Sequence, residues 1–193
     1  MLRMIDYLKE EGIVSEEEVP IVLYGMKIVL ITVVEFISIL LVAIWRENIL
    51  EGLWFLLGFC PLRLYVGGYH SKTPIRCYFM TIAVYMVFSL LLAVIPVEMY
   101  RTIELITGVL TFCMVHHFAP IVHENRKINF FEVKRYRCIS MKIILIDLLL
   151  IVTSEAIAPQ KIYILSFSLG LAIVCFFMIV VLVKGLNLRR RKR

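Results

Sequence analysis

The longest uncharged run in the chain, residues 162–183, is twenty-two residues of mostly apolar side chains. At about 1.5 Å per residue, a helix of that length covers the ~30 Å hydrocarbon thickness of a bilayer. A second run, residues 79–97, has nineteen residues and no charge. Hydrophobic residues make up 61% of the chain, and its mean hydropathy is +0.90. An ordinary soluble protein is thereby excluded, and we predict an all-α integral membrane protein.

The apolar runs divide this protein into about six hydrophobic helical segments within a single membrane domain, residues 1–193. We predict the segments at residues 20–45, 49–66, 78–97, 102–122, 143–158 and 162–184. The second segment is short, because its uncharged part covers only about half of the hydrocarbon thickness and contains Gly58 and Pro61. The sequence leaves open whether this segment is re-entrant or spans the membrane with Arg63 drawn partly inside.

The N-terminal segment, residues 1–19, is acidic and interrupted by apolar residues at helical spacing. These apolar residues are Met1, Met4, Ile5 and Leu8. Such spacing predicts an amphipathic helix on the membrane surface, although a frayed terminus is an equal alternative.

Basic residues predict the orientation of the chain. They gather in a loop, residues 123–142, and in a tail, residues 185–193, which the positive-inside rule assigns to the cytoplasm. Counting back across the segments, the loop after Arg63 also falls on the cytoplasmic side of the cell membrane, and so does the N-terminus if the short second segment crosses. The basic residues that give the net charge of +6 lie between and after apolar runs. This placement indicates a protein oriented in a lipid bilayer, and no nucleic-acid partner is predicted.

The stretch from Arg63 to Cys77 has a composition that is not typical of a lipid-facing apolar segment. It reads Arg-Leu-Tyr-Val-Gly-Gly-Tyr-His-Ser-Lys-Thr-Pro-Ile-Arg-Cys. On one continuous helix His70 and Cys77 would lie about 10 Å apart, too far for proton transfer. Thr73 is a good N-cap and Pro74 is favoured at the first helical position, so a helix is predicted to begin there.

A helix that begins at Pro74 places Cys77 in its first turn, where the helix dipole favours a thiolate. Gly67 and Gly68 give the backbone before His70 the freedom to turn back toward the sulfur. The stretch therefore predicts a Cys–His nucleophilic pair. The alternative is that the cysteine packs in an apolar helix and the histidine is solvated in a loop.

These residues also resemble the signature of a known family. Arg63, Gly67-Gly68-Tyr69-His70, Thr73 and Cys77 are similar to the motif of the AgrB family of bacterial membrane peptidases, which process the AgrD-type propeptide of a quorum-sensing peptide. The resemblance extends over the whole chain in length, hydropathy and motif position. It implies that His70 and Cys77 are catalytic, and that Arg63 matches the family's arginine ahead of the glycine pair.

The resemblance further implies a membrane cysteine endopeptidase whose substrate is an AgrD-like propeptide with an amphipathic helix and an acidic tail. The cleaved product is expected to close into a thiolactone or lactone. We expect no cofactor and no metal, and a homodimer is left open. The other candidates are oxyanion or substrate-binding residues (Arg63, Gly67, Gly68, Thr73 and Arg76) and orienting carboxylates (Glu35 and Asp147).

Two other functions compete with this interpretation. A metal or haem site could use Cys113, His116, His117 and His123, since thiolate and imidazole suit zinc, copper or iron. A small transporter could use the carboxylates within apolar segments, Glu35, Asp147 and Glu155. No second cluster completes the metal ligands, and no broken helices recur in matched halves, as inverted-repeat transporters require.

Overall fold

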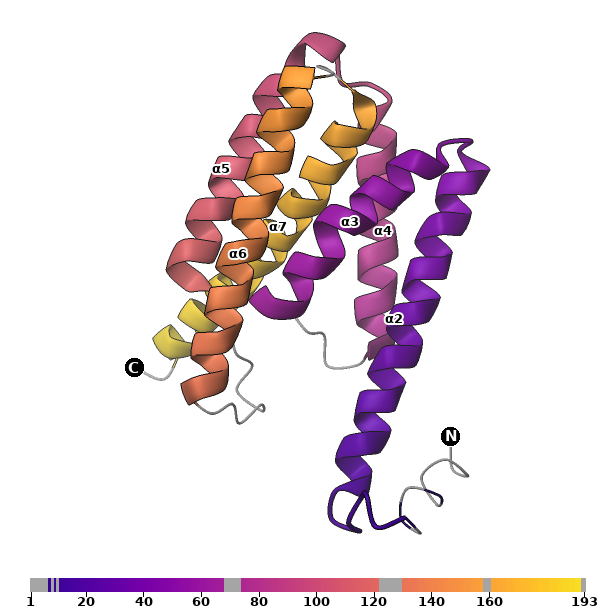
Figure 1. The fold of residues 1–193 in the computed structure, drawn as a ribbon, viewed down its shortest axis with the longest axis vertical. Helices are drawn as coiled ribbons and strands as arrows, with labels where there is room; N and C mark the ends of the chain where they lie inside the picture. The colour runs from indigo at the N-terminus through magenta and orange to yellow at the C-terminus, as the bar shows by residue number, and fades with distance from the viewer. Residues whose placement is uncertain are drawn as a thin grey trace.

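A computed structural model describes residues 7, 9, 11–67, 74–121, 130–157 and 161–191. Within these residues the chain forms six α-helices, one 3-10 helix and no β-strand (Figure 1). In order they are α2 (Val19–Trp45), α3 (Ile49–Val66), α4 (Pro74–Leu92), η1 (Val97–Met99), α5 (Tyr100–Phe118), α6 (Phe130–Ile157) and α7 (Ile162–Arg191). The predicted all-α fold with about six helical segments is confirmed.

Helix α7 is the centre of the arrangement. It packs most extensively against α3 and α5, while α6 completes a group with α5 and α7, and α2 and α4 lie on the other side of α3 (Figure 1). Two glycines allow α3 and α7 to approach closely. A Cβ on Gly58 would lie 2.4 Å from the Phe167 carbonyl oxygen, and one on Gly170 would lie 2.6 Å from the Phe55 carbonyl oxygen. Small residues are the usual means by which membrane helices bring their backbones together.

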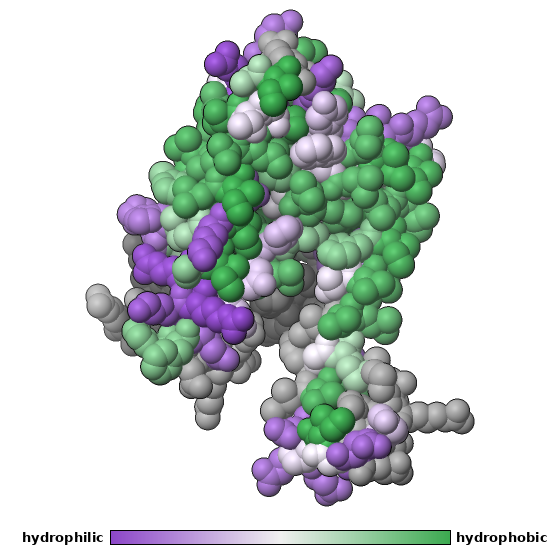
Figure 2. All heavy atoms as spheres, in the orientation of Figure 1, coloured by the Kyte–Doolittle hydropathy of each residue, from purple (hydrophilic) through white to green (hydrophobic). Residues whose placement is uncertain are grey.

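In the part of the chain that the structure describes, three helices are long and apolar enough to cross a membrane: Gly25–Trp45 within α2, Ile49–Val66, and Ile162–Val183 within α7. A further pair, Tyr78–Leu92 and Val97–Phe118, meets the same criterion together but is bent by 117°. The short second segment, whose course was left open, is thus one continuous helix with Pro61 inside it. Figure 2 shows hydrophobic side chains over much of the visible helix surface, as lipid contact requires.

Helix α6 departs from the expected basic loop. It begins at Phe130, so residues 130–142 are helical, whereas the apolar pattern placed the start of this segment at Ile143. Lysine and arginine are good helix formers, and here Lys134, Arg135 and Arg137 are exposed. Charge therefore marked where the apolar part of the helix begins, but not where the helix itself begins.

The four apolar residues on which the predicted N-terminal amphipathic helix depends, Met1, Met4, Ile5 and Leu8, lie outside the described residues. Tyr7 and Lys9 are helical, and residues 11–18 form turns before α2. Within these turns the amide and hydroxyl of Ser15 both donate to the Glu18 carboxylate, at 3.0 Å and 2.9 Å. These bonds lower the pKa of Glu18.

One end of the bundle collects the helix ends that border the Arg63–Cys77 stretch, and we call it the motif end. There α3 ends, α4 begins, α5 ends and α6 begins (Figure 1). Tyr65 and Tyr136 bring α3 and α6 together with ring centroids 6.0 Å apart. Arg137 on α6 donates to the His116 carbonyl oxygen at the end of α5 over 3.1 Å.

Candidate functional site

The predicted Cys–His stretch connects two separate helices at the motif end. Helix α3 ends at Val66, and α4 begins at Pro74, the residue at which the sequence predicts a helix start. Cys77 is the fourth residue of α4 and so lies at the helix start, where the dipole is positive. Residues 68–73, with the predicted Gly68, His70 and Thr73, lie outside the described residues.

Gly67 makes the turn that ends α3. Its φ is +75°, a backbone conformation that side chains disfavour, and a Cβ there would lie 2.4 Å from the Ile121 carbonyl oxygen. The amide of Ile121 donates to the Val66 carbonyl oxygen over 2.8 Å, which forms a short parallel bridge. The chain that follows α5 therefore holds the entry to the motif in place.

Arg63 lies one turn before Gly67 and supports the same turn. Its Nη1 donates to the Gly67 carbonyl oxygen over 2.8 Å. The guanidinium carbon lies 4.9 Å from the centroid of the Phe177 ring on α7, a distance at which a cation is attracted to an aromatic face. Arg63 thus joins the end of α3 to the central helix, and its expected oxyanion role stays a prediction.

Of the two carboxylates predicted to orient the histidine, Glu35 on α2 lies beside motif residues. Thr81 on α4 and Arg63 on α3 both lie within electrostatic reach of its carboxyl group. Thr81 is 2% exposed and lies four residues after Cys77, which is one helical turn. A second link between α2 and α4 joins the hydroxyls of Ser38 and Tyr78 at 2.8 Å.

Asp147 does not share these contacts. It is 8% exposed on α6, and its Oδ2 has no hydrogen-bond partner in the described part of the chain. Nothing in the described residues connects it with Cys77, Arg63 or Glu35, so only Glu35 is brought to motif residues.

Positive charge lies around the motif end. Arg76 is exposed in the first turn of α4. The first half of α6 carries an exposed basic face of Lys134, Arg135, Arg137 and Lys142, and hydrophilic side chains gather on that side of the molecule in Figure 2. The motif end is therefore suited to an anionic segment of a partner.

The described residues contain no group of three or more His, Cys, Asp or Glu side chains that could hold a metal ion. Cys113, His116 and His117 are exposed on α5, where His116 stacks on Phe112 with centroids 6.0 Å apart. The fourth residue of that predicted set, His123, lies outside the described residues.

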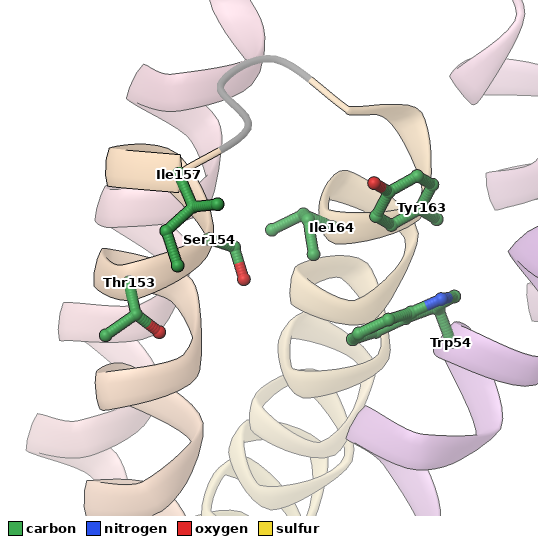
Figure 3. Close-up of a pocket in the computed structure, with 6 residues that line it drawn as sticks. All are labelled: Trp54, Thr153, Ser154, Ile157, Tyr163 and Ile164. Atoms are coloured by element: carbon green, nitrogen blue, oxygen red, sulfur yellow. The ribbon is translucent and has the colours of Figure 1, made fainter.

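A pocket of about 240 Å³ lies at the opposite end of the bundle, where α6 ends and α7 begins (Figure 3). Trp54 and Tyr163 stack beside it with centroids 5.4 Å apart. The other lining residues are Thr153, Ser154, Ile157 and Ile164. Because its lining lies at the other end of the bundle from the start of α4, this pocket is not part of the predicted site.

Comparison with known proteins shows the family of the chain. The model of the AgrB family, accessory gene regulator B, matches residues 1–180. The chain belongs to the AgrB family. AgrB-like protein 2 of Clostridium perfringens (strain 13 / Type A) is 29% identical over 165 residues, which cover 80% of this chain and 77% of that protein. No solved structure matches the chain significantly.

Family membership and the apolar helices together make this AgrB protein a membrane component of the accessory gene regulator system. The structure adds residues that sequence reasoning did not single out. Thr81 could have been found from its spacing of one turn after Cys77. The sequence does not indicate that Phe177 and Ile121 contact motif residues, because an apolar residue within an apolar run does not show which residues it will pack against.

Proposed function

We propose that this AgrB protein is a membrane-embedded cysteine endopeptidase that cleaves an AgrD-type propeptide. The observation that carries the proposal is the family match over residues 1–180, with His70 and Cys77 in place. The position of Cys77 at the start of α4 supports it, because a helix N-terminus stabilises a thiolate. The break between α3 and α4 further supports it, since Val66 and Cys77 belong to different helices.

In the first step His70 accepts the proton of the Cys77 thiol, and the sulfur attacks the scissile carbonyl carbon. The carbon–nitrogen bond then breaks, and the amine of the C-terminal fragment leaves with the proton that His70 carried. The N-terminal fragment remains attached to Cys77 as a thioester. Free backbone amides at the start of α4 are the proposed donors to the oxyanion, with Gly67, Gly68, Thr73 and Arg76 around them.

In the second step a Cys or Ser side chain of the bound fragment attacks the thioester carbonyl. The new bond closes a thiolactone or lactone ring, and the Cys77 sulfur leaves and takes back a proton. A site partly shielded from water slows the competing hydrolysis of the thioester. The product is a cyclic peptide of the kind used in quorum sensing.

The proposed orientation places the motif end and both termini on the cytoplasmic side. The exposed basic face on α6, near the motif end, supports this orientation through the positive-inside rule. The same face is the proposed contact for the acidic tail of the propeptide, since Lys and Arg attract carboxylates at the surface.

The test is cleavage of an AgrD-type propeptide by the purified protein in proteoliposomes. Cys77→Ala and His70→Ala should each abolish cleavage while leaving membrane insertion intact. Cys113→Ala and Cys138→Ala are matched controls, because both side chains are exposed cysteines away from α4, and they should cleave normally. Cleavage by Cys77→Ala would falsify the assignment.

A further inference from the structure

We infer that the outward side of α6 at the motif end binds the anionic headgroups of phospholipids. Between Phe130 and Ile143 this helix carries four basic residues and one acid, Glu132. The basic residues, all of them exposed, are Lys134, Arg135, Arg137 and Lys142. The inference goes beyond the proposed function, because it assigns a lipid partner to this part of α6 and does not depend on the peptidase reaction.

Helical spacing places two of these basic residues on the lipid-facing side of α6. Lys142 follows Arg135 by seven residues, which is close to two turns. Ile146 and Leu149 follow Arg135 by eleven and fourteen residues, close to three and four turns, and both are 63% exposed. The opposite side of the helix is buried at Ser140, Ile144, Asp147 and Ile151. Arg135 and Lys142 therefore continue the exposed apolar side of α6 toward the motif end.

Lys142 lies inside the level at which a neighbouring helix ends. Arg137 marks that level, because it donates to the His116 carbonyl oxygen near the end of α5. Lys142 is five residues further along α6, which is about 7.5 Å deeper along the helix axis. In a helix the Cα–Cβ bonds tilt toward the N-terminus, so the lysine stem is directed back to the motif end, where lipid headgroups lie. In Figure 2 hydrophilic side chains on this side of the molecule adjoin the hydrophobic surface.

Arg135 and Lys142 form no ion pair within the described part of the chain. A cation at the edge of the membrane is stabilised by the anionic headgroups of the adjoining leaflet. A phospholipid supplies this anion while its acyl chains cover the exposed apolar side of α6. Lipid is favoured over the acidic tail of the propeptide, because the two charges lie on the same side of the helix as the lipid-facing residues. Arg137, two residues after Arg135, lies on the other side of α6 and stays available to the tail together with Arg76.

The test measures which lipids lie beside Cys138, an exposed native cysteine one turn before Lys142. The full-length protein, with its other cysteines replaced, carries a bimane fluorophore on Cys138. It is reconstituted in vesicles of phosphatidylglycerol and phosphatidylcholine in equal parts, and a nitroxide on the acyl chain of one lipid or the other quenches the nearby fluorophore. The association constant of phosphatidylglycerol relative to phosphatidylcholine should be at least about three, since each basic residue near the surface attracts anionic lipid.

Charge removal shows whether these two residues cause the preference. Arg135→Gln combined with Lys142→Gln should reduce the relative association constant to about one, because the attraction to anionic lipid is electrostatic. Arg101→Gln combined with Lys161→Gln is the matched control. It also removes one arginine and one lysine, both exposed at the opposite end of the bundle, and should leave the preference at Cys138 unchanged. Arg135→Lys combined with Lys142→Arg conserves both charges and should keep the preference, which separates the charge from any effect on the fold.

Equal quenching by the two lipids before any charge is removed would overturn the inference, and so would a preference that persists in the double glutamine variant. Equal quenching together with a change in bimane emission on addition of an acidic peptide would assign this side of α6 to the propeptide tail instead. None of these measurements uses cleavage. Failure of the peptidase proposal therefore appears separately, as cleavage by Cys77→Ala.

Discussion

The amide of Ile121 donates to the carbonyl oxygen of Val66 over 2.8 Å, which ties the chain after α5 to the last residue of α3. This bond makes the residue after Val66, Gly67, part of a parallel bridge to Ile121. The backbone that leads into the predicted catalytic stretch is consequently supported from outside the stretch. The contact explains why the motif has a glycine at position 67.

The first prediction concerns that glycine. Gly67→Ala should destabilise the protein by about 2 kcal/mol or more, because positive φ costs an L-residue about 1–2 kcal/mol and the new Cβ also meets the Ile121 carbonyl oxygen. Thermal unfolding in detergent measures the change. Gly12→Ala is the matched control, since Gly12 has φ +67° but no neighbour within 4 Å of a Cβ. Equal losses in the two variants would mean that the contact with Ile121 contributes nothing.

The second prediction concerns the guanidinium of Arg63 on the Phe177 ring. Phe177→Leu removes the ring face and should cost about 0.5–2 kcal/mol from the cation–π contact, beyond the change in packing. Arg63→Lys should also lower the stability of the protein, because an ammonium group cannot stack on the Phe177 ring as the planar guanidinium does while it donates to the Gly67 carbonyl oxygen. In a double-mutant cycle the two losses should be less than additive. Additive losses would show that the contact carries no coupling energy.

The third prediction concerns the helix start at Pro74. Thr73→Val combined with Pro74→Ala should weaken the start of α4 and reduce the thiolate fraction of Cys77 at neutral pH, because the amides and dipole at that end favour negative charge. The rate of Cys77 alkylation as a function of pH measures this effect, and its midpoint should move upward. Exposed Cys113 is the internal control. An unchanged pH profile in the double variant would leave the helix start without a role in activation.

The fourth prediction concerns orientation in the membrane. Cys138, exposed on the first half of α6, should react with a membrane-impermeant maleimide only from the cytoplasmic side. Gln160→Cys, in the connection between α6 and α7, should react only from the other side, because α6 separates the two positions. Labelling of position 160 from the cytoplasm would reverse the orientation and move the proposed active site to the other face.

The amino-acid sequence was sufficient for features that depend on local chemistry. Runs of apolar residues predicted the helical membrane segments because each backbone group must be bonded internally in lipid. The start of α4 at Pro74 was predictable because proline is preorganised for the first helical position and lacks the amide that would be unpaired there. Spacing between His70 and Cys77 already required a break between them.

Only the tertiary structure decided which distant residues meet. Glu35 and Asp147 were equal candidates in the sequence, since both are carboxylates in apolar segments, but only Glu35 lies beside Thr81 and Arg63. Which neighbour a buried side chain meets depends on how each helix is rotated and how closely it packs. For α3 and α7 that packing follows from Gly58 and Gly170. Hydrophobic residues are distributed nearly uniformly around these helices, so the periodicity of the sequence says little about how each helix is rotated about its axis. The close packing of the helix backbones determines that rotation.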